Sequence, residues 1–90
     1  MRFEWDPKKA EENYRKHFIR FSEVEPVFDD EHAIEFLDES SEEERYLGIG
    51  MDGFGRVLVV VYTWRGENVR LISARRATRS EERQYAKGQR

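Results

Sequence analysis

The feature that most constrains the fold is an apolar segment, residues 56–64, that stands between two glycine-containing turns. Because this segment is apolar on both faces, we expect it at the centre of a sheet, covered on both sides for part of its length. The turns at residues 52–55 and 65–68 contain glycine, which can supply the positive φ that hairpin turns require. The two hairpins predict that residues 45–51 and 69–76 are its antiparallel neighbours.

Helix signals precede this predicted sheet. Asp6-Pro7 is a strong helix start, because Asp can cap a helix and Pro fits its first position. Apolar residues then recur at helical spacing and predict one continuous helix; they are Ala10, Tyr14, His17, Phe18 and Phe21. Ser22 and Glu25 match a capping box that opens a short second helix.

The remaining elements complete an α+β fold. Short strands are predicted at residues 3–5 and 33–37. Thr78 and Glu81 match a second capping box, which opens a C-terminal helix that ends near Gly88. We therefore expect a single domain over the whole chain: an antiparallel sheet of about four strands, two N-terminal helices packed on it, and a short C-terminal helix.

The charges are distributed unevenly along the chain. The net charge of −3 combines +2 over residues 1–20, −11 over residues 21–44 and +6 over residues 45–90. All but one of the cations in the last segment are arginines, the residue type suited to bidentate phosphate contacts. The acidic segment can face a basic partner or simply keep the surface solvated, and the sequence leaves both readings open.

Several kinds of chemistry find no support. The chain has no cysteine, which excludes disulfides and thiol catalysis. Its two histidines, His17 and His32, lack a metal-ligand spacing, so we predict neither a metal site nor a cofactor. The G-x-G-x-x-G string at residues 48–53 leads into a hairpin instead of a helix, which argues against a dinucleotide site. With no apolar run near the ~20 residues of a membrane span and no signal segment, we expect a cytoplasmic protein that does not contact membranes.

The residues that most suggest a function are arginines near the C-terminus: Arg70, Arg75, Arg76, Arg79 and Arg83. Strand alternation places Arg70 and Arg76 on one face and Arg75 on the other, unless a bulge intervenes. Arg79 and Arg83 share one side of the predicted final helix. Such a cluster can hold a phosphate and stabilise its transition-state charge. The alternative is a solvated terminus whose arginines pair with neighbouring glutamates.

One histidine and a few aromatic residues add to this cluster. His17 is a base that titrates near neutral pH, and it falls near the end of the first predicted helix. A packed helix-end histidine is the alternative interpretation. Trp5, Tyr62, Trp64 and Tyr85 could stack on unpaired bases, and core packing explains such aromatics equally well.

Ordered motifs along nearly the whole chain resemble the BrnT toxin family. They are FEWDP-x-KA at 3–10, N-x-RKH at 13–17, F-x-E at 21–23, VFDD at 27–30, ER at 44–45, GR-x-L-x-VV at 55–61, RG at 65–66, R-x-ISARRAT at 70–78 and ER-x-Y at 82–85. The ISARRAT string after a hairpin is the most specific of them. The sequence departs from the family at Phe18, where members commonly have glycine, and at Trp64, where they commonly have a polar residue.

The resemblance implies a RelE-like ribonuclease toxin that is encoded beside a DNA-binding antitoxin. That partner is expected to be a BrnA-like ribbon-helix-helix protein, through which the complex would contact DNA only indirectly. The substrate would be RNA, cut by attack of a 2′-hydroxyl without a metal. The resemblance gives as candidate catalytic residues His17, Arg45, Arg75, Arg76 and Tyr85. The candidate RNA-binding residues are Arg70, Arg79, Arg83 and Trp64.

A specific hypothesis follows for the reaction. Arg75 and Arg76 would hold the phosphate, His17 would transfer a proton, and Arg45 would position the substrate. Tyr85 could stack on a base or donate a proton. Two alternatives remain: a module that binds nucleic acid without cutting it, and an interaction protein whose acidic segment and basic tail only dock the antitoxin.

Overall fold

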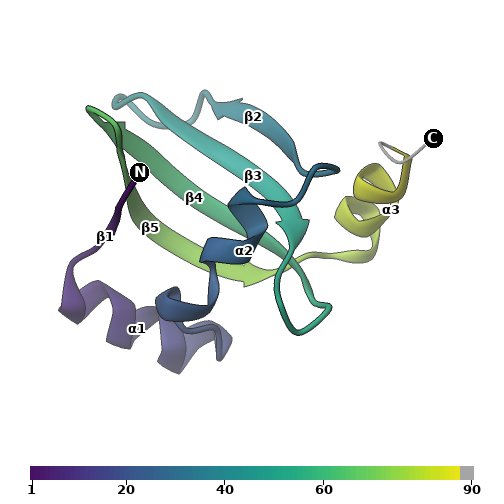
Figure 1. The fold of residues 1–90 in the computed structure, drawn as a ribbon, viewed down its shortest axis with the longest axis horizontal. Helices are drawn as coiled ribbons and strands as arrows, with labels where there is room; N and C mark the ends of the chain where they lie inside the picture. The colour runs from purple at the N-terminus through teal and green to yellow at the C-terminus, as the bar shows by residue number, and fades with distance from the viewer. Residues whose placement is uncertain (88–90) are drawn as a thin grey trace.

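The fold of this chain, seen in a computed structural model that describes residues 1–87, is built on one five-stranded sheet (Figure 1). The strand order is β1-β5-β4-β3-β2, with β4 at the centre. The strands are β1 (Phe3–Glu4), β2 (Ile34–Asp38), β3 (Arg45–Met51), β4 (Val57–Arg65) and β5 (Asn68–Arg76). Strands β2 to β5 form the predicted antiparallel meander. The predicted α+β class is confirmed, and β1 adds a fifth strand, parallel to β5.

The helical segments are unequally divided between the two faces of the sheet. They are α1 (Pro7–His17), the 3-10 helix η1 (Phe21–Glu23), α2 (Glu25–Phe28) and α3 (Arg79–Lys87). We call the face that carries Leu58, Val60 and Tyr62 the core face, because these buried residues pack with those of η1 and α2. The opposite face, which carries Val59 and Val61, is the open face, and α3 covers only one end of it through Tyr85. No helix within residues 1–87 is long and apolar enough to span a bilayer.

Two of the three predicted helix starts are confirmed. The Asp6 carboxylate accepts a hydrogen bond from the Lys8 N–H at 2.9 Å, with Pro7 at the first helical position. In the second capping box the Thr78 N–H donates to Glu81 at 2.8 Å and the Glu81 N–H donates to Thr78 Oγ1 at 3.2 Å. The capping box predicted at Ser22 is wrong, since α2 begins after Val24 without a side-chain cap. The predicted C-terminal end near Gly88 lies outside the described residues.

The prediction that the first helix continues to Phe21 is also wrong. The helix ends at His17 because Phe18 adopts the left-handed conformation, with φ of 58°, and its N–H donates to the Tyr14 carbonyl. The chain then turns so that Ile19 and Phe21 are buried, although they no longer continue the helix. Phe18 itself is 70% exposed. Glycine is the usual residue at such a helix end, because it adopts the left-handed conformation without steric strain.

A β-bulge in β5 changes which arginines share a face. Tyr62 pairs with Leu71 and Val61 pairs with Ser73, so Ile72 has no partner on β4. This extra residue reverses the alternation beyond it. Arg70 and Arg75 therefore lie on the open face, while Arg76 lies on the core face opposite Leu58. The simple alternation that grouped Arg70 with Arg76 is corrected by this bulge.

Asn13 joins α1 to the outer edge of β5. It is 5% exposed, and its side-chain amide donates to the carbonyls of Ala74 at 2.9 Å and Ile19 at 3.0 Å. Its side-chain oxygen accepts from the Ala74 N–H at 3.0 Å. Strand β1 reaches only Val69 and Arg70, so Asn13 satisfies the backbone groups of β5 beyond the point where β1 ends. This contact fixes α1 along the outer edge of β5, where Ala10 packs against the residues of the core face.

Candidate functional site

Two adjoining cavities between α1 and the open face form a basic groove. One has a volume of about 180 Å³ and contains Lys9, Arg45, Arg65 and Arg70. The other has a volume of about 370 Å³ and contains Lys16 and His17. Lys9 and Ile72 line both cavities, so the two cavities are neighbours. Together they fall within the range of about 300–1,000 Å³ that is usual for ligand sites.

The lining of the basic groove carries a positive net charge. Six cations line it (Lys9, Arg15, Lys16, Arg45, Arg65 and Arg70) against three acids (Asp6, Glu12 and Glu43). These cations come from α1 and from three different strands, so the fold gathers charges that are dispersed in the sequence. A concave surface of one sign attracts an anionic ligand and concentrates it locally.

Arg45 and Arg70 are only loosely paired with acids. Arg45 Nη2 lies 4.0 Å from Glu43, and Arg70 Nη1 lies 3.9 Å from Glu4. In addition, Arg45 Nε is buried and has no hydrogen-bond partner among the described residues. A buried donor without a partner costs about 1–3 kcal/mol. The two arginine side chains are nevertheless partly exposed to the groove, at 34% for Arg45 and 35% for Arg70. These two arginines are therefore available to a phosphate.

His17 stands at the other end of the basic groove. It is the last residue of α1 and is half-buried, facing the same cavity as Ser73 and Ile72. The hydrogen bonds of Asn13 hold this end of α1 against β5. The arrangement places an imidazole in a cavity that adjoins the one lined by Arg45 and Arg70.

Arg75, by contrast, is committed to a carboxylate. Its two terminal nitrogens donate to the two oxygens of Glu81 at 2.7 and 2.8 Å. This bidentate contact, with support from the Thr78 N–H, lowers the pKa of Glu81 to about 2. It also raises the pKa of Arg75. The pair ties α3 to the end of β5, so Arg75 has a structural contact where the sequence suggested a phosphate ligand.

Tyr85 also serves to hold α3. Its ring packs on Ile49 and Val59, and its hydroxyl donates to Asp30 at 2.6 Å. Burial and this hydrogen bond to a carboxylate raise the pKa of Tyr85 to about 12. Burial alone would raise the pKa of Asp30, but the bonds from Tyr85 and the Met51 N–H outweigh it and leave that pKa low.

The other predicted site residues lie outside the basic groove. Arg76, Arg79 and Arg83 are exposed, the first on the core face and the other two on α3. Trp64 lies on the core face, where it meets Tyr62 edge to face. The structure thus places the pair Arg45 and Arg70 at one end of the basic groove and His17 at the other, and it leaves Arg75, Arg76 and Tyr85 outside the groove.

Sequence reasoning missed Lys9 and Arg65 as groove residues. Both belong to the motifs quoted above, FEWDP-x-KA and RG, but neither has a local pattern that indicates a site. Their common position follows only from the contact of α1 with the turn end of β4 and β5. Within residues 1–87, no group of three or more His, Asp or Glu side chains is arranged to hold a metal ion.

The comparisons with known proteins agree with this architecture. The chain shares its fold with the crystal structure of the ribonuclease toxin BrnT from Brucella abortus, with a TM-score of 0.74 and 26% identity. The match covers 88% of this chain and 99% of that chain. A search of curated protein sequences finds no match.

A family model defines the class more closely. Residues 5–81 match the family described as the ribonuclease toxin, BrnT, of type II toxin-antitoxin systems. Fold and match together place the chain among the toxins of such systems, whose partner is an antitoxin. The chain belongs to the BrnT family.

Proposed function

We propose that this protein is an endoribonuclease that cleaves RNA by 2′-hydroxyl attack without a metal, and that the basic groove holds the scissile phosphate. Membership of the BrnT family supports ribonuclease activity. The observation that carries the choice of site is the loosely paired state of Arg45 and Arg70, with a buried Arg45 N–H that no described residue accepts.

The reaction needs positive charge and two proton transfers. The 2′-oxygen attacks phosphorus as a base removes its proton, and the bond from phosphorus to the 5′-oxygen breaks as an acid protonates the leaving group. The products are a 2′,3′-cyclic phosphate and a free 5′-hydroxyl. Arg45 and Arg70 stabilise the charge of the pentacoordinate intermediate, and His17 transfers a proton.

The basic groove suits RNA for two further reasons. Lys9 and Arg65 extend the positive surface beyond the two central arginines, which favours binding of a backbone with several phosphates. The arginines can also form bidentate contacts with phosphate oxygens. In this proposal Arg75 is structural, because both of its terminal nitrogens hold Glu81.

The test is cleavage of RNA by the purified protein in EDTA, beside DNA of the same sequence. RNA alone should be cut. Arg45→Ala and Arg70→Ala should each lower the rate by ~10²–10³, as expected for loss of a transition-state contact. Arg79→Ala, an exposed arginine on α3, is the matched control and should cut at the parental rate.

Two results would overturn the proposal. Undiminished cleavage by an Arg45→Ala/Arg70→Ala double variant would move the site elsewhere. RNA binding without any cleavage product, by protein that melts normally and is free of antitoxin, would favour a module that binds nucleic acid without cutting it.

A further inference from the structure

We propose that an acid-rimmed apolar surface on the core face is where a cationic segment of the antitoxin docks. The inference uses the family's partnership with an antitoxin and not the chemistry proposed for the basic groove. The expected occupant is a peptide segment that carries Lys or Arg side chains around at least one large apolar side chain.

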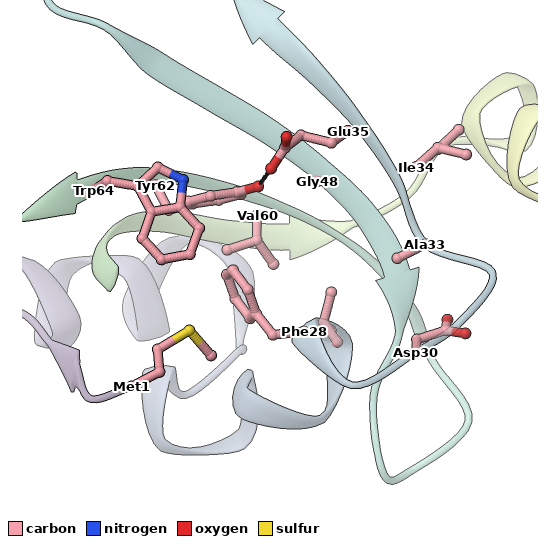
Figure 2. Close-up of a pocket in the computed structure, with 11 residues that line it drawn as sticks. Met1, Phe28, Asp30, Ala33, Ile34, Glu35, Gly48, Val60, Tyr62 and Trp64 are labelled. Atoms are coloured by element: carbon pink, nitrogen blue, oxygen red, sulfur yellow. Dashed lines mark hydrogen bonds between the residues drawn. The ribbon is translucent and has the colours of Figure 1, made fainter. Parts of the chain in front are cut away.

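The centre of this surface is an apolar pocket of about 360 Å³ (Figure 2). Val60 and Phe28 line it, with Trp64 and Tyr62 on one side. Trp64 is 44% exposed and adjoins the rings of the pocket, so the exposed apolar area is contiguous and not a single isolated side chain. The pocket is therefore able to accept one bulky apolar side chain from a partner.

A second hollow, which shares no lining residue with the apolar pocket, lies further along the sheet. Leu37 pairs with Tyr46, and Tyr46 pairs with Tyr62, whose ring stacks on it at 5.8 Å. Leu37 and Tyr46 line the second hollow together with five acidic residues between positions 38 and 44. Leu37 is 55% exposed. Apolar contact area thus extends from the pocket to the edge strand β2.

The charge around this surface selects the partner. Asp30 and Glu35 line the apolar pocket. The five acids of the second hollow come from the end of β2, which supplies Asp38, and from the loop between β2 and β3, which supplies the other four. Among the described residues that line the two cavities, none is Lys, Arg or His. Phosphates would be repelled here, so RNA is a poor occupant, while a cationic segment would gain from complementary charge.

A second copy of this chain is a less suitable occupant. Strand β2 is at the edge of the sheet, and Glu35 and Asp38 lie on it. Pairing two such edges would bring like charges together, which is one way that proteins prevent edge-to-edge association. The same charges favour a partner of opposite sign.

The experiment measures binding of this toxin to the antitoxin with which it is encoded, by titration calorimetry at two salt concentrations. Trp64→Ala should weaken binding about 30-fold, as expected for an aromatic anchor residue. Glu39→Lys/Glu42→Lys should weaken binding most at low salt, because rim charges act through screened attraction. Leu37→Ala tests the surface independently if Trp64→Ala fails to fold.

The control variant is Glu11→Lys/Glu82→Lys, which changes the net charge equally on α1 and α3. It should bind the antitoxin at parental affinity. Cleavage of RNA by the free Trp64→Ala and Glu39→Lys/Glu42→Lys variants should also stay at the parental rate. Failure of the ribonuclease proposal would therefore leave this binding test intact.

Four outcomes would overturn the inference. The first is parental antitoxin affinity in both surface variants. The second is loss of antitoxin binding in Arg45→Ala or Arg70→Ala instead, which would place the partner over the basic groove. The third is self-association of the free toxin that Trp64→Ala abolishes, which would assign the surface to a second copy. The fourth is reduced RNA affinity in Trp64→Ala.

Discussion

The basic groove lies on the open face, the apolar pocket lies on the core face, and the two regions approach each other only at the β2–β3 loop, where Glu43 lines both the groove and the second hollow. On the open face, arginines from β3, β4 and β5 converge with few close acidic partners. Around the apolar pocket and the second hollow, acids from the α2–β2 segment, from β2 and from the β2–β3 loop lie near aromatic rings. The net charge of −3 hides this division. Under the two proposals above, the same small sheet binds an anionic ligand in the basic groove and a cationic ligand on the acid-rimmed surface.

The largest effect is expected at the histidine of the basic groove. His17→Ala should lower RNA cleavage by ~10²–10⁴, the usual loss for a proton-transfer group. Antitoxin affinity should not change, because His17 is remote from the acid-rimmed surface. Single-turnover cleavage assays beside calorimetry measure both quantities. The division between the faces fails if Glu39→Lys/Glu42→Lys reduces cleavage more than His17→Ala does.

The next effect concerns how the wall of the groove is held. Asn13→Ala should lower the free energy of unfolding by ~2–4 kcal/mol, because it leaves buried backbone groups of Ala74 and Ile19 without partners. Urea unfolding of the variant and the parent measures this difference in the free energy of unfolding. Glu12→Ala, an exposed change on the same helix, should stay within ~0.5 kcal/mol of the parent. A small loss in Asn13→Ala would mean that α1 is held mainly by apolar packing.

Acid should weaken the clamp between Arg75 and Glu81. The pKa of Glu81 falls from 4.5 to about 2 on folding, so this contribution is complete above pH 4.5 and is lost as pH falls toward 2. Because Arg75 is 39% exposed, we expect only ~1–2 kcal/mol after solvent screening. Unfolding measured between pH 5 and 2 should show this slope in the parent and less of it in Glu81→Gln. Equal slopes would show that the pair contributes nothing to stability, which would free Arg75 for phosphate.

The smallest effect is a gain of stability at the end of α1. Phe18→Gly should raise the free energy of unfolding by ~0.5–1 kcal/mol, since glycine removes a strain of ~1–2 kcal/mol at φ of 58° and loses only an exposed ring. Phe18→Ala keeps the strain and loses the ring contact with Tyr14, so it should be less stable than the parent. Thermal unfolding of both variants measures these changes in stability. If Phe18→Gly is less stable than the parent, the ring of Phe18 contributes to packing.

The sequence predicts the parts of this fold that depend on neighbouring residues. Asp6 and the Thr78–Glu81 pair cap their helices as local patterns indicate, and glycine turns define the meander. It does not predict the bulge at Ile72, because a bulge depends on how two strands pair. Nor does it show that Phe18 ends α1, since the apolar spacing continues past that point to Phe21.

The candidate site, too, is predicted only where local patterns indicate it and not where it depends on contacts between distant segments. His17, Arg45 and Arg70 were chosen from the sequence, but their common groove depends on the contact of α1 with β5 through Asn13. Arg75 is predicted as a phosphate ligand because it belongs to the C-terminal arginine cluster and to the ISARRAT motif. The sequence could not show that Glu81 both caps α3 and accepts from Arg75, a contact that satisfies its two nitrogens.

The side chain of Asn13 also affects how copies of this protein can assemble. It forms hydrogen bonds with the backbone of Ala74 at the outer edge of β5, and β1 pairs with Val69 and Arg70 of the same strand. The long edge that remains available for addition of another strand is therefore β2. Growth of a fibre by strand addition requires two available sheet edges on every molecule. Any strand-mediated aggregate of this toxin should therefore stop at a closed pair instead of extending.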